Sequence, residues 1–448
     1  MQFQQKKFFI ETFGCQMNEF DSERIIFILE NKGYIKSGNP DEADIILLNT
    51  CSVREKAENR LFGHLGSFKA LKIKKPGLII CVGGCTAQSE GERLMSKFPY
   101  IDIVFGTSNI GMLPGLINDR FVKNRSICNT GELPENFDYL YDFKRQYDFK
   151  ALLPIMVGCN NFCSYCIVPF VRGRERSAEP EQIINAVKKL AGQGVIEIML
   201  LGQNVNSYGK DLVNKSYGFG QLLRDISAVS GIKRIRFMTS HPKDFTEDII
   251  DAISENNNIM KHIHLPLQAG SDRILELMNR KYTSGKYKEL YYMIKEKIPG
   301  CFITTDIIAG FPGENEADFL KTLEIVRELR FNRAFTFIYS QRKGTSAAPM
   351  QDIIPDDIKR TWFKKLLDEQ NRISLQENEK LVGKKFEVLV EGFSRRDYHL
   401  EGRLENNLIV NFDGNSDMTG KLIDVEITGA KSFYLTGKLY DKQKRKSD

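Results

Sequence analysis

Three closely spaced cysteines restrict this chain more than any other feature of its sequence. Cys159, Cys163 and Cys166 form a C-x3-C-x2-C run directly after residues 152–157, an apolar segment that we predict to be a strand. The loops at the carboxyl ends of parallel strands carry the chemistry of α/β folds. Three thiolates can hold three irons of a [4Fe–4S] cluster and leave the fourth open to a substrate, whereas a structural zinc site closes its fourth position. Because the next cysteine is Cys301, we favour the cluster; a zinc site completed from far away and plain core thiols are the alternatives.

Length and composition set the frame for the other cysteines. The chain has 448 residues and 42% hydrophobic content, which suits a globular protein of about three domains. No stretch approaches the roughly 20 apolar residues of a membrane span, and residues 1–13 lack the apolar region of a secretory signal. We therefore predict a cytoplasmic protein without a membrane partner, whose grouped cysteines are metal ligands or catalytic thiols. The net charge of +6 is compatible with an RNA partner but does not require one.

Apolar runs that alternate with helical stretches predict an α/β fold for most of the chain. The first predicted strands are residues 8–13, 45–48, 78–82 and 101–105. Strands separated by helices indicate an open parallel α/β sheet. Residues 121–150 lack periodicity and are predicted to be a linker. Six more predicted strands follow, at residues 152–157, 197–201, 234–238, 262–267, 302–308 and 333–339. Six strand–helix units fit an incomplete (β/α)6 barrel better than a flat sandwich.

The pattern changes to strands alone from about residue 384. Five short predicted strands lie at residues 386–390, 398–404, 408–412, 422–427 and 434–439. Turn signals such as Asn406-Asn407 and Asp413-Gly414 separate them. Five short strands in about 60 residues predict a small β-barrel, like the folds that bind single-stranded nucleic acid.

Cys15, Cys51 and Cys85 share one position although they are far apart in the sequence. Each stands just after a predicted strand of the N-terminal sheet. Parallel strands bring their carboxyl ends to one edge, so these three loops could converge on a second cluster, again with one open iron. By spacing alone, three separated cysteines are usually unrelated, and their shared position after strands makes a second cluster and unrelated cysteines equally good interpretations.

Seven short sequence segments, three of them around Cys15, Cys51 and Cys85, carry a resemblance to a known family. They are TFGCQMNE (12–19), NTCSVREKA (49–57), GGCTAQ (83–88), RGRERS (172–177), LLGQNVNSY (200–208), HLPLQAGS (264–271) and DIIAGFPGE (306–314). In this order they resemble the methylthiotransferases of the radical S-adenosylmethionine (SAM) superfamily, and the C-terminal strands resemble their RNA-binding TRAM domain. The branch that acts on a ribosomal protein usually has Pro-Lys-Asn after its first cysteine. Gln16-Met17-Asn18 stands there in this chain, which favours tRNA.

The resemblance implies the reaction and its cofactors. It implies two [4Fe–4S] clusters, one at each cysteine group, and SAM both as methyl donor and as the source of a 5′-deoxyadenosyl radical. The expected product carries a methylthio group on carbon 2 of N(6)-isopentenyladenosine at position 37 of tRNA, next to the anticodon. The expected domains are an N-terminal methylthiotransferase domain (6–122), a radical SAM core (145–376) and a TRAM domain (379–442).

The resemblance also suggests which residues bind SAM. Tyr165, just before the last cysteine of its run, is expected near the adenine. Gly202, Gln203 and Asn204 follow a predicted strand where the superfamily commonly holds the methionine end of SAM. Two further candidates end later strands, Gln268 and Asp306. No catalytic residue is expected beyond the cluster ligands.

Partners follow from the same resemblance. The anticodon loop of tRNA is the expected substrate, and the candidates for phosphate contacts are Arg172, Arg174, Arg176, Arg395, Arg396 and Arg403. The expected protein partners are an electron donor such as a flavodoxin or ferredoxin and a carrier of sulfur or clusters. The alternatives are the sister enzyme that acts on threonylcarbamoyl-adenosine and, in another class, a non-catalytic iron–sulfur or zinc RNA-binding protein. Cys81, Cys128 and Cys301 match no cluster position, and we assign them no role.

Overall fold

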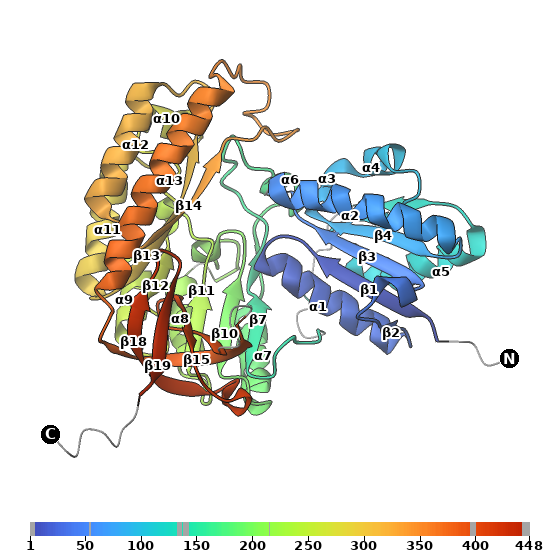
Figure 1. Cartoon of the computed structure of the whole chain (residues 1–448), viewed down its shortest axis with the longest axis horizontal. Coiled ribbons are helices and arrows are strands. Elements are labelled where there is room, and N and C mark those ends of the chain that lie inside the picture. Colours follow the sequence, from blue (N-terminus) through green and yellow to red (C-terminus); the bar gives the residue numbers. More distant parts are fainter. Residues whose placement is uncertain are drawn as a thin grey trace.

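The structure, a computed structural model, describes residues 5–52, 55–131, 137, 143–214, 216–394 and 400–440, without the side chains of residues 55–59. Three regions follow one another along the chain (Figure 1): an N-terminal region drawn in blue, a central region, and a C-terminal barrel drawn in red. Within the described residues, no helix combines the length and the apolar character that crossing a bilayer requires.

A six-stranded parallel sheet in the order β2-β1-β3-β4-β5-β6 forms the N-terminal region. Its strands are β1 (Lys7–Thr12), β2 (Ile35–Lys36), β3 (Ile45–Thr50), β4 (Ile79–Gly84), β5 (Ile103–Phe105) and β6 (Ile127–Asn129). One face is covered by α1 (Gln16–Asn31) and α5 (Leu113–Lys123), and the other by α2 (Glu55–Lys74), α3 (Cys85–Glu90) and α4 (Glu92–Lys97). Strands β3 and β4 are buried throughout, which is the placement that continuous apolar runs predict. The predicted open parallel sheet is confirmed.

The central region is a half-barrel made of two three-stranded parallel sheets, in the orders β11-β10-β7 and β12-β13-β14. Its strands are β7 (Lys150–Pro154), β10 (Glu197–Leu201), β11 (Arg234–Phe237), β12 (His262–His264), β13 (Phe302–Ala309) and β14 (Arg333–Ile338). The longer helices are α7 (Pro180–Gly192), α8 (Phe219–Ser227), α9 (Glu247–Glu255), α11 (Ser284–Lys297), α12 (Glu316–Leu329) and α13 (Asp356–Glu379). Shorter elements are β8 (Met156–Val157), α6 (Val168–Val171), β9 (Arg176–Ser177) and α10 (Asp272–Leu277). Strands β7 and β14 end the two sheets and do not pair with each other in the described structure, so the predicted incomplete barrel is confirmed.

The C-terminal region is a closed barrel of five strands in the order β15-β16-β17-β19-β18. They are β15 (Lys385–Phe393), β16 (Leu400–Arg403), β17 (Ile409–Phe412), β18 (Leu422–Ala430) and β19 (Tyr434–Leu439). The small β-barrel predicted from the sequence is thus confirmed.

The barrel closes the amino-terminal end of the half-barrel. Arg234 and Arg236 lie on β11 and are buried, and their guanidinium groups point at the backbone of the C-terminal barrel. Four carbonyl oxygens accept from them at 2.7–2.9 Å, those of Glu387, Arg403, Leu404 and Glu405. The carboxyl ends of the strands, where the cysteine loops lie, remain at the other end.

Two local predictions were wrong. The predicted linker contains β6, whose three residues pair with β5 and extend the N-terminal sheet; three residues are too few to show a periodicity. The predicted strands 152–157 and 262–267 are shorter, since β7 ends at Pro154 and β12 stops two residues before Pro266. A proline has no N–H to donate to a neighbouring strand.

Candidate metal centres and S-adenosylmethionine site

The loop that carries the first cysteine group, Cys159, Cys163 and Cys166, follows β8 at the carboxyl end of the half-barrel. The Cys159 N–H donates to the carbonyl of Gly173 at 3.1 Å, and Cys166 N–H donates to the carbonyl of Cys163 at 2.9 Å. Phe162 adopts a left-handed conformation with φ of 46°, which turns the chain between the first two cysteines. The Cys163 thiol raises the pKa of both Cys159 and Cys166 by its charge, as expected for a thiol that stands between them in one loop.

Burial controls the ionisation of two of these thiols, Cys159 and Cys166. It raises the pKa of Cys159 to about 11 and that of Cys166 to about 12. Metal ligation requires thiolates, so loading this site must release protons.

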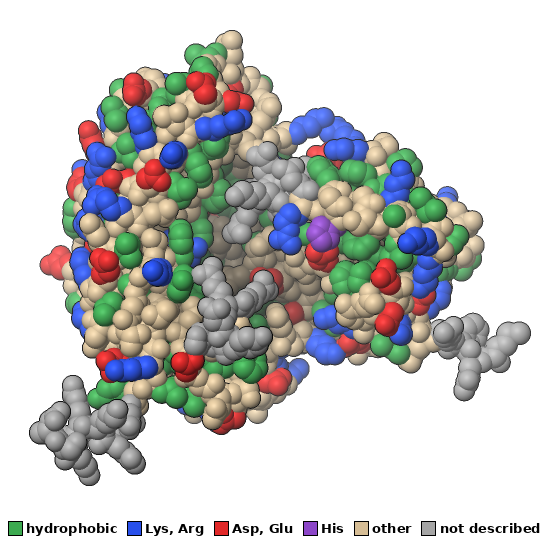
Figure 2. Space-filling model, viewed as in Figure 1, with side chains coloured by type: hydrophobic (Ala, Val, Ile, Leu, Met, Phe, Trp, Pro, Cys, Tyr) green, Lys and Arg blue, Asp and Glu red, His purple; other side chains and the backbone are tan. Residues whose placement is uncertain are grey.

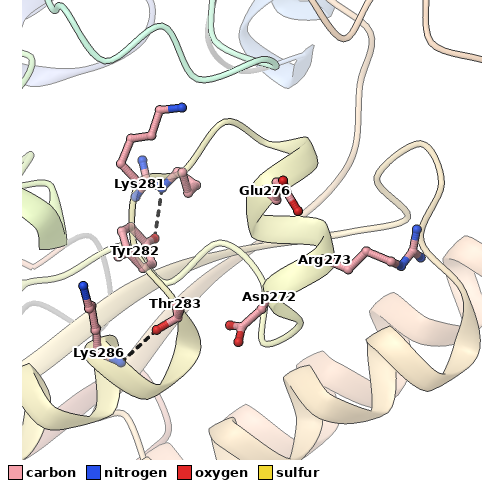
Figure 3. Close-up of a pocket in the computed structure, with 8 residues that line it drawn as sticks. Asp272, Arg273, Glu276, Lys281, Tyr282, Thr283 and Lys286 are labelled. Atoms are coloured by element: carbon pink, nitrogen blue, oxygen red, sulfur yellow. Dashed lines mark hydrogen bonds between the residues drawn. The ribbon is translucent and has the colours of Figure 1, made fainter.

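Arg280 is a buried arginine of this site that the sequence did not reveal. Its Nη1 lies 3.3 Å from Cys163 Sγ, and its Nη2 donates to the carbonyl of Pro266 at 2.9 Å. Its Nε donates to the hydroxyl of Tyr282 at 2.9 Å. Arg280 and Tyr282 also line a surface pocket of about 520 Å³, whose rim carries Lys281 and Lys286 (Figure 3). The guanidinium thus joins this pocket to a candidate cluster ligand.

The second cysteine group, Cys15, Cys51 and Cys85, lies where β1, β3 and β4 end. Gly14 has a φ of +126°, and a Cβ built there would lie 2.3 Å from Cys51 Cβ and 3.0 Å from Cys51 Sγ. Only glycine therefore allows the first two loops to touch. Cys15 caps the amino terminus of α1, and Cys85 begins α3.

The thiols of this group differ in acidity. A hydrogen bond with the Cys51 thiol, followed by the charge of Arg172, lowers the pKa of Cys15 to about 6. Burial raises the pKa of Cys85 above its usual value. The group therefore holds one thiol that is ready to act as a thiolate ligand at neutral pH.

Arg172 belongs to the central region but reaches into the second cysteine group. Its side chain is buried, and its Nη2 lies 2.6 Å from Asp21 Oδ2 and 3.5 Å from Asn18 Oδ1. It also forms a hydrogen bond with Cys85. This position corrects our expectation of a phosphate contact, because the guanidinium is enclosed by protein and already paired. Asp21 and Asn18 were missed because nothing in the local sequence shows that α1 faces another region.

Two of the expected SAM residues support the cysteine loop from β10. The side-chain oxygen of Gln203 accepts from the N–H of Gly158, directly before Cys159. Asn204 is 2% exposed and donates to Asp244 Oδ2 at 2.9 Å and to Glu175 Oε1 at 3.4 Å. Its own Oδ1 is buried and has no partner among the described residues. A buried acceptor without a donor is costly, and a bound ligand can supply that donor.

The other expected SAM residues occupy the carboxyl end of the half-barrel. Tyr165 packs against the central core, and the Gly202 carbonyl accepts from Thr239 at 2.7 Å. Gln268 is buried with a φ of +71°, and its N–H donates to the carbonyl of Asp306 at 2.8 Å. The Asp306 carboxylate lies 3.3 Å from the ring of His264.

Comparisons with known proteins match all three regions. An uncharacterized protein family, UPF0004, matches residues 7–106, the radical SAM superfamily matches residues 153–326, and the TRAM domain matches residues 379–440. A tRNA-2-methylthio-N(6)-dimethylallyladenosine synthase from Clostridium tetani is 50% identical over 97% of this chain and 96% of its own length. The chain belongs to this synthase family. The resemblance inferred from the sequence motifs is confirmed.

Other relatives agree with the synthase assignment. The synthase of Carboxydothermus hydrogenoformans is 47% identical over 97% of this chain and 99% of its own length. Among solved structures, a radical SAM methyltransferase from Kitasatospora setae with cobalamin and a [4Fe–4S] cluster bound has a TM-score of 0.55 at 12% identity. It covers 77% of this chain and 74% of its own. At that identity the likeness establishes the fold alone.

The arginines expected to bind RNA in this synthase lie in different environments. Arg174 is exposed, with its guanidinium 4.2 Å from the ring centre of Phe162. Arg176 is half-buried in β9. Arg403 pairs with Glu391 of the same barrel at 2.9 Å, and its side chain stays 30% exposed. Two further candidates, Arg395 and Arg396, lie outside the described residues.

Each of the two cysteine groups offers three thiols as metal donors. A zinc ion gathers four ligands within about 2.0–2.3 Å of one point, and in the described part of the chain no three His, Cys, Asp or Glu side chains are so arranged. In a cluster each thiolate binds a different iron. Three thiols are a donor set of this kind, so Cys159, Cys163 and Cys166 would hold one cluster, and Cys15, Cys51 and Cys85 are the candidates for another.

Proposed function

We propose that this enzyme adds a methylthio group to carbon 2 of N(6)-isopentenyladenosine at position 37 of tRNA, next to the anticodon. One observation carries the proposal. Arg172 follows the loop of the first cysteine group in the sequence and contacts the second cysteine group in space. This contact supports a single site to which both sets of three thiols contribute. The molecule is hollowed between the N-terminal region and the other two (Figure 2), which offers a nucleotide a way in.

Two bound clusters and SAM would supply a radical able to take the unactivated hydrogen from carbon 2, together with the methylthio sulfur. The SAM-dependent cluster belongs to Cys159, Cys163 and Cys166, and we assign a second [4Fe–4S] cluster to Cys15, Cys51 and Cys85.

The residues of the chain provide the positioning. Asn204 Oδ1, which lacks a donor among the described residues, would accept from the SAM ammonium group, as expected for the Gly202-Gln203-Asn204 segment. Gln203 fixes the start of the cysteine loop through Gly158. Tyr165, Gln268 and Asp306 complete the proposed SAM site. Arg280 is a positioning residue, since it acts through Cys163.

The RNA enters with the target base unstacked, as enzymes that act on bases require. An anticodon loop lowers that cost because its bases are already splayed. Arg174, Arg176, Arg395, Arg396 and Arg403 remain candidates for phosphate contacts. We retain 6–122, 145–376 and 379–442 as the proposed limits of the three domains.

Two protein partners complete the proposal. Reductive cleavage of SAM needs one electron, which a flavodoxin or ferredoxin would deliver. The sulfur that is inserted must be replaced by a sulfur or cluster carrier. We also propose that the enzyme works in the cytoplasm.

Nucleoside analysis of tRNA from a strain without this gene tests the function. The methylthio form of isopentenyladenosine should vanish, isopentenyladenosine should accumulate, and a plasmid copy should restore the product. A plasmid copy with Cys51→Ala should not restore it. Loss of the methylthio form of threonylcarbamoyl-adenosine instead would favour the sister reaction, and an unchanged profile would overturn both.

A further inference from the structure

The two walls of the half-barrel differ in what covers their inner faces. On the β7–β10 side, Met17 and Phe20 of α1 pack against Leu152, Met199 and Leu201. On the β13–β14 side, Asp306 pairs in register with Phe335, and Ile308 with Phe337. All four of these residues are half-buried or exposed, and Phe337 is 37% exposed. The inner face of a parallel sheet is normally covered, so this wall is available to a ligand.

One arginine and three aromatic rings follow one another along this open wall. Phe335 faces the half-barrel, since its ring centre lies 5.8 Å from that of His264 on β12. Arg333, two residues earlier on the same face, places its guanidinium 4.9 Å from the Phe335 ring centre and 5.4 Å from that of Phe433. Phe433 belongs to the C-terminal barrel and is 46% exposed. The wall therefore continues from the central region onto the barrel.

The charges near the wall favour an anionic ligand. Arg333 has no carboxylate partner among the described residues, and burial, together with the positive charge of Arg403 that acts on it, lowers the pKa of Arg333. The acidic groups nearby are already engaged, because Glu391 pairs with Arg403 and Asp306 lies against His264. Arg333 is thus a cation whose described neighbours are rings and a like charge.

We propose that Arg333, Phe335, Phe337 and Phe433 form a platform on which the tRNA-loop nucleotides next to the target adenosine stack. Rings that stack bases and a cation that meets a phosphate are the two elements of single-strand recognition. The platform lies on the strand next to Asp306, so bases held there adjoin the proposed SAM site. This inference rests on the proposed function, because it takes tRNA as the substrate.

The test is the affinity of the full-length holoenzyme for a synthetic anticodon stem-loop RNA that contains isopentenyladenosine, measured by fluorescence anisotropy at several salt concentrations. Stacking is worth about 1–3 kcal/mol per base, so Phe337→Ala should raise the Kd about 5- to 150-fold. Phe337→Trp keeps a ring and should retain most of the affinity. Arg333→Gln should reduce the slope of log affinity against log salt by about 0.7.

Tyr292→Ala is the matched control, because Tyr292 is 50% exposed but lies on α11, away from this wall. It should bind the RNA like the unaltered enzyme. Thermal melting of each variant distinguishes lost contacts from lost folding, and a Phe337→Ala protein that melts normally and binds normally would overturn the platform. If the unaltered enzyme itself neither binds nor modifies this RNA, the proposed function fails instead.

Discussion

The two cysteine groups are built in opposite ways. Cys159, Cys163 and Cys166 stand in one loop, which needs only local turns to bring its thiols together. Cys15, Cys51 and Cys85 come from three strand ends and meet only when the N-terminal sheet is folded. Each group has a buried arginine beside it, but Arg280 comes from the same region as its cysteines and Arg172 comes from another region.

This difference makes the second proposed cofactor site depend on the central region, whereas the first does not depend on the N-terminal region. The first group is complete within the central region. The second is complete only when Arg172 is seated against Asp21 on α1. Four predictions test this contrast, beginning with the largest effect.

Removing all thiols of either group should abolish tRNA modification, but the two variants should differ in whether they still cleave SAM. After anaerobic reconstitution we expect about eight irons per chain, four per cluster, and about four in each triple Ala variant. The triple Ala variant of Cys159, Cys163 and Cys166 should lose SAM cleavage. The triple Ala variant of Cys15, Cys51 and Cys85 should retain it. Iron analysis measures the cluster content, and detection of 5′-deoxyadenosine measures SAM cleavage. The Cys128→Ala/Cys301→Ala control should keep all the iron; a native protein with a single zinc would contradict the two-cluster interpretation.

Arg172→Met should destabilise the metal-free protein by about 3–5 kcal/mol, because it leaves the Asp21 carboxylate buried without a partner. Chemical unfolding followed by fluorescence measures the change. The double variant Arg172→Met/Asp21→Asn should recover part of the loss. Lys123→Met breaks an exposed pair with Asp119 and should cost less than about 1 kcal/mol. Equal costs for the two single variants would show that Arg172 does not join the regions.

Each arginine should tune only its own cluster. Nearby positive charge and hydrogen bonds to sulfur raise a cluster's reduction potential, so Arg280→Met should lower that of the SAM-dependent cluster and Arg172→Met that of the second. Asp21→Asn, which leaves Arg172 without its counter-charge, should raise the second potential. Redox titration followed by electron paramagnetic resonance separates the two signals. A shift of both potentials by either variant would remove the contrast.

The smallest effect concerns thiol reactivity in the metal-free protein. Only thiolates react with iodoacetamide, and the pKa of Cys15 is lowered to about 6, so its alkylation should slow as the pH falls below 6. Cys159, with its pKa raised to about 11, should react slowly until strongly alkaline pH. Cys51→Ala removes the largest cause of the shift and should move the Cys15 inflection upward. Peptide mass spectrometry across pH measures both sites.

The sequence predicted the three regions because their apolar patterns are local and continuous. It also placed Cys15, Cys51 and Cys85 after strands that proved to be neighbours, since parallel topology brings their ends to one edge. It could not predict Arg172 and Arg280 beside the cysteines, because their burial depends on contacts between distant segments. Arg172 stands among other arginines in RGRERS, where a solvated or RNA-binding role is the natural local interpretation.

The contact between β11 and the barrel has a consequence for synthesis on the ribosome. Arg236 donates to the carbonyl of Glu405, 169 residues later in the chain. At about 5–20 residues per second, that acceptor emerges roughly 10 to 30 seconds after the arginine. Throughout that interval the amino-terminal end of the nascent half-barrel is uncovered, and the guanidinium groups of Arg234 and Arg236 lack their carbonyl acceptors. A reading frame truncated before β16 would therefore yield a protein that contains every cysteine but whose central region remains accessible to proteases.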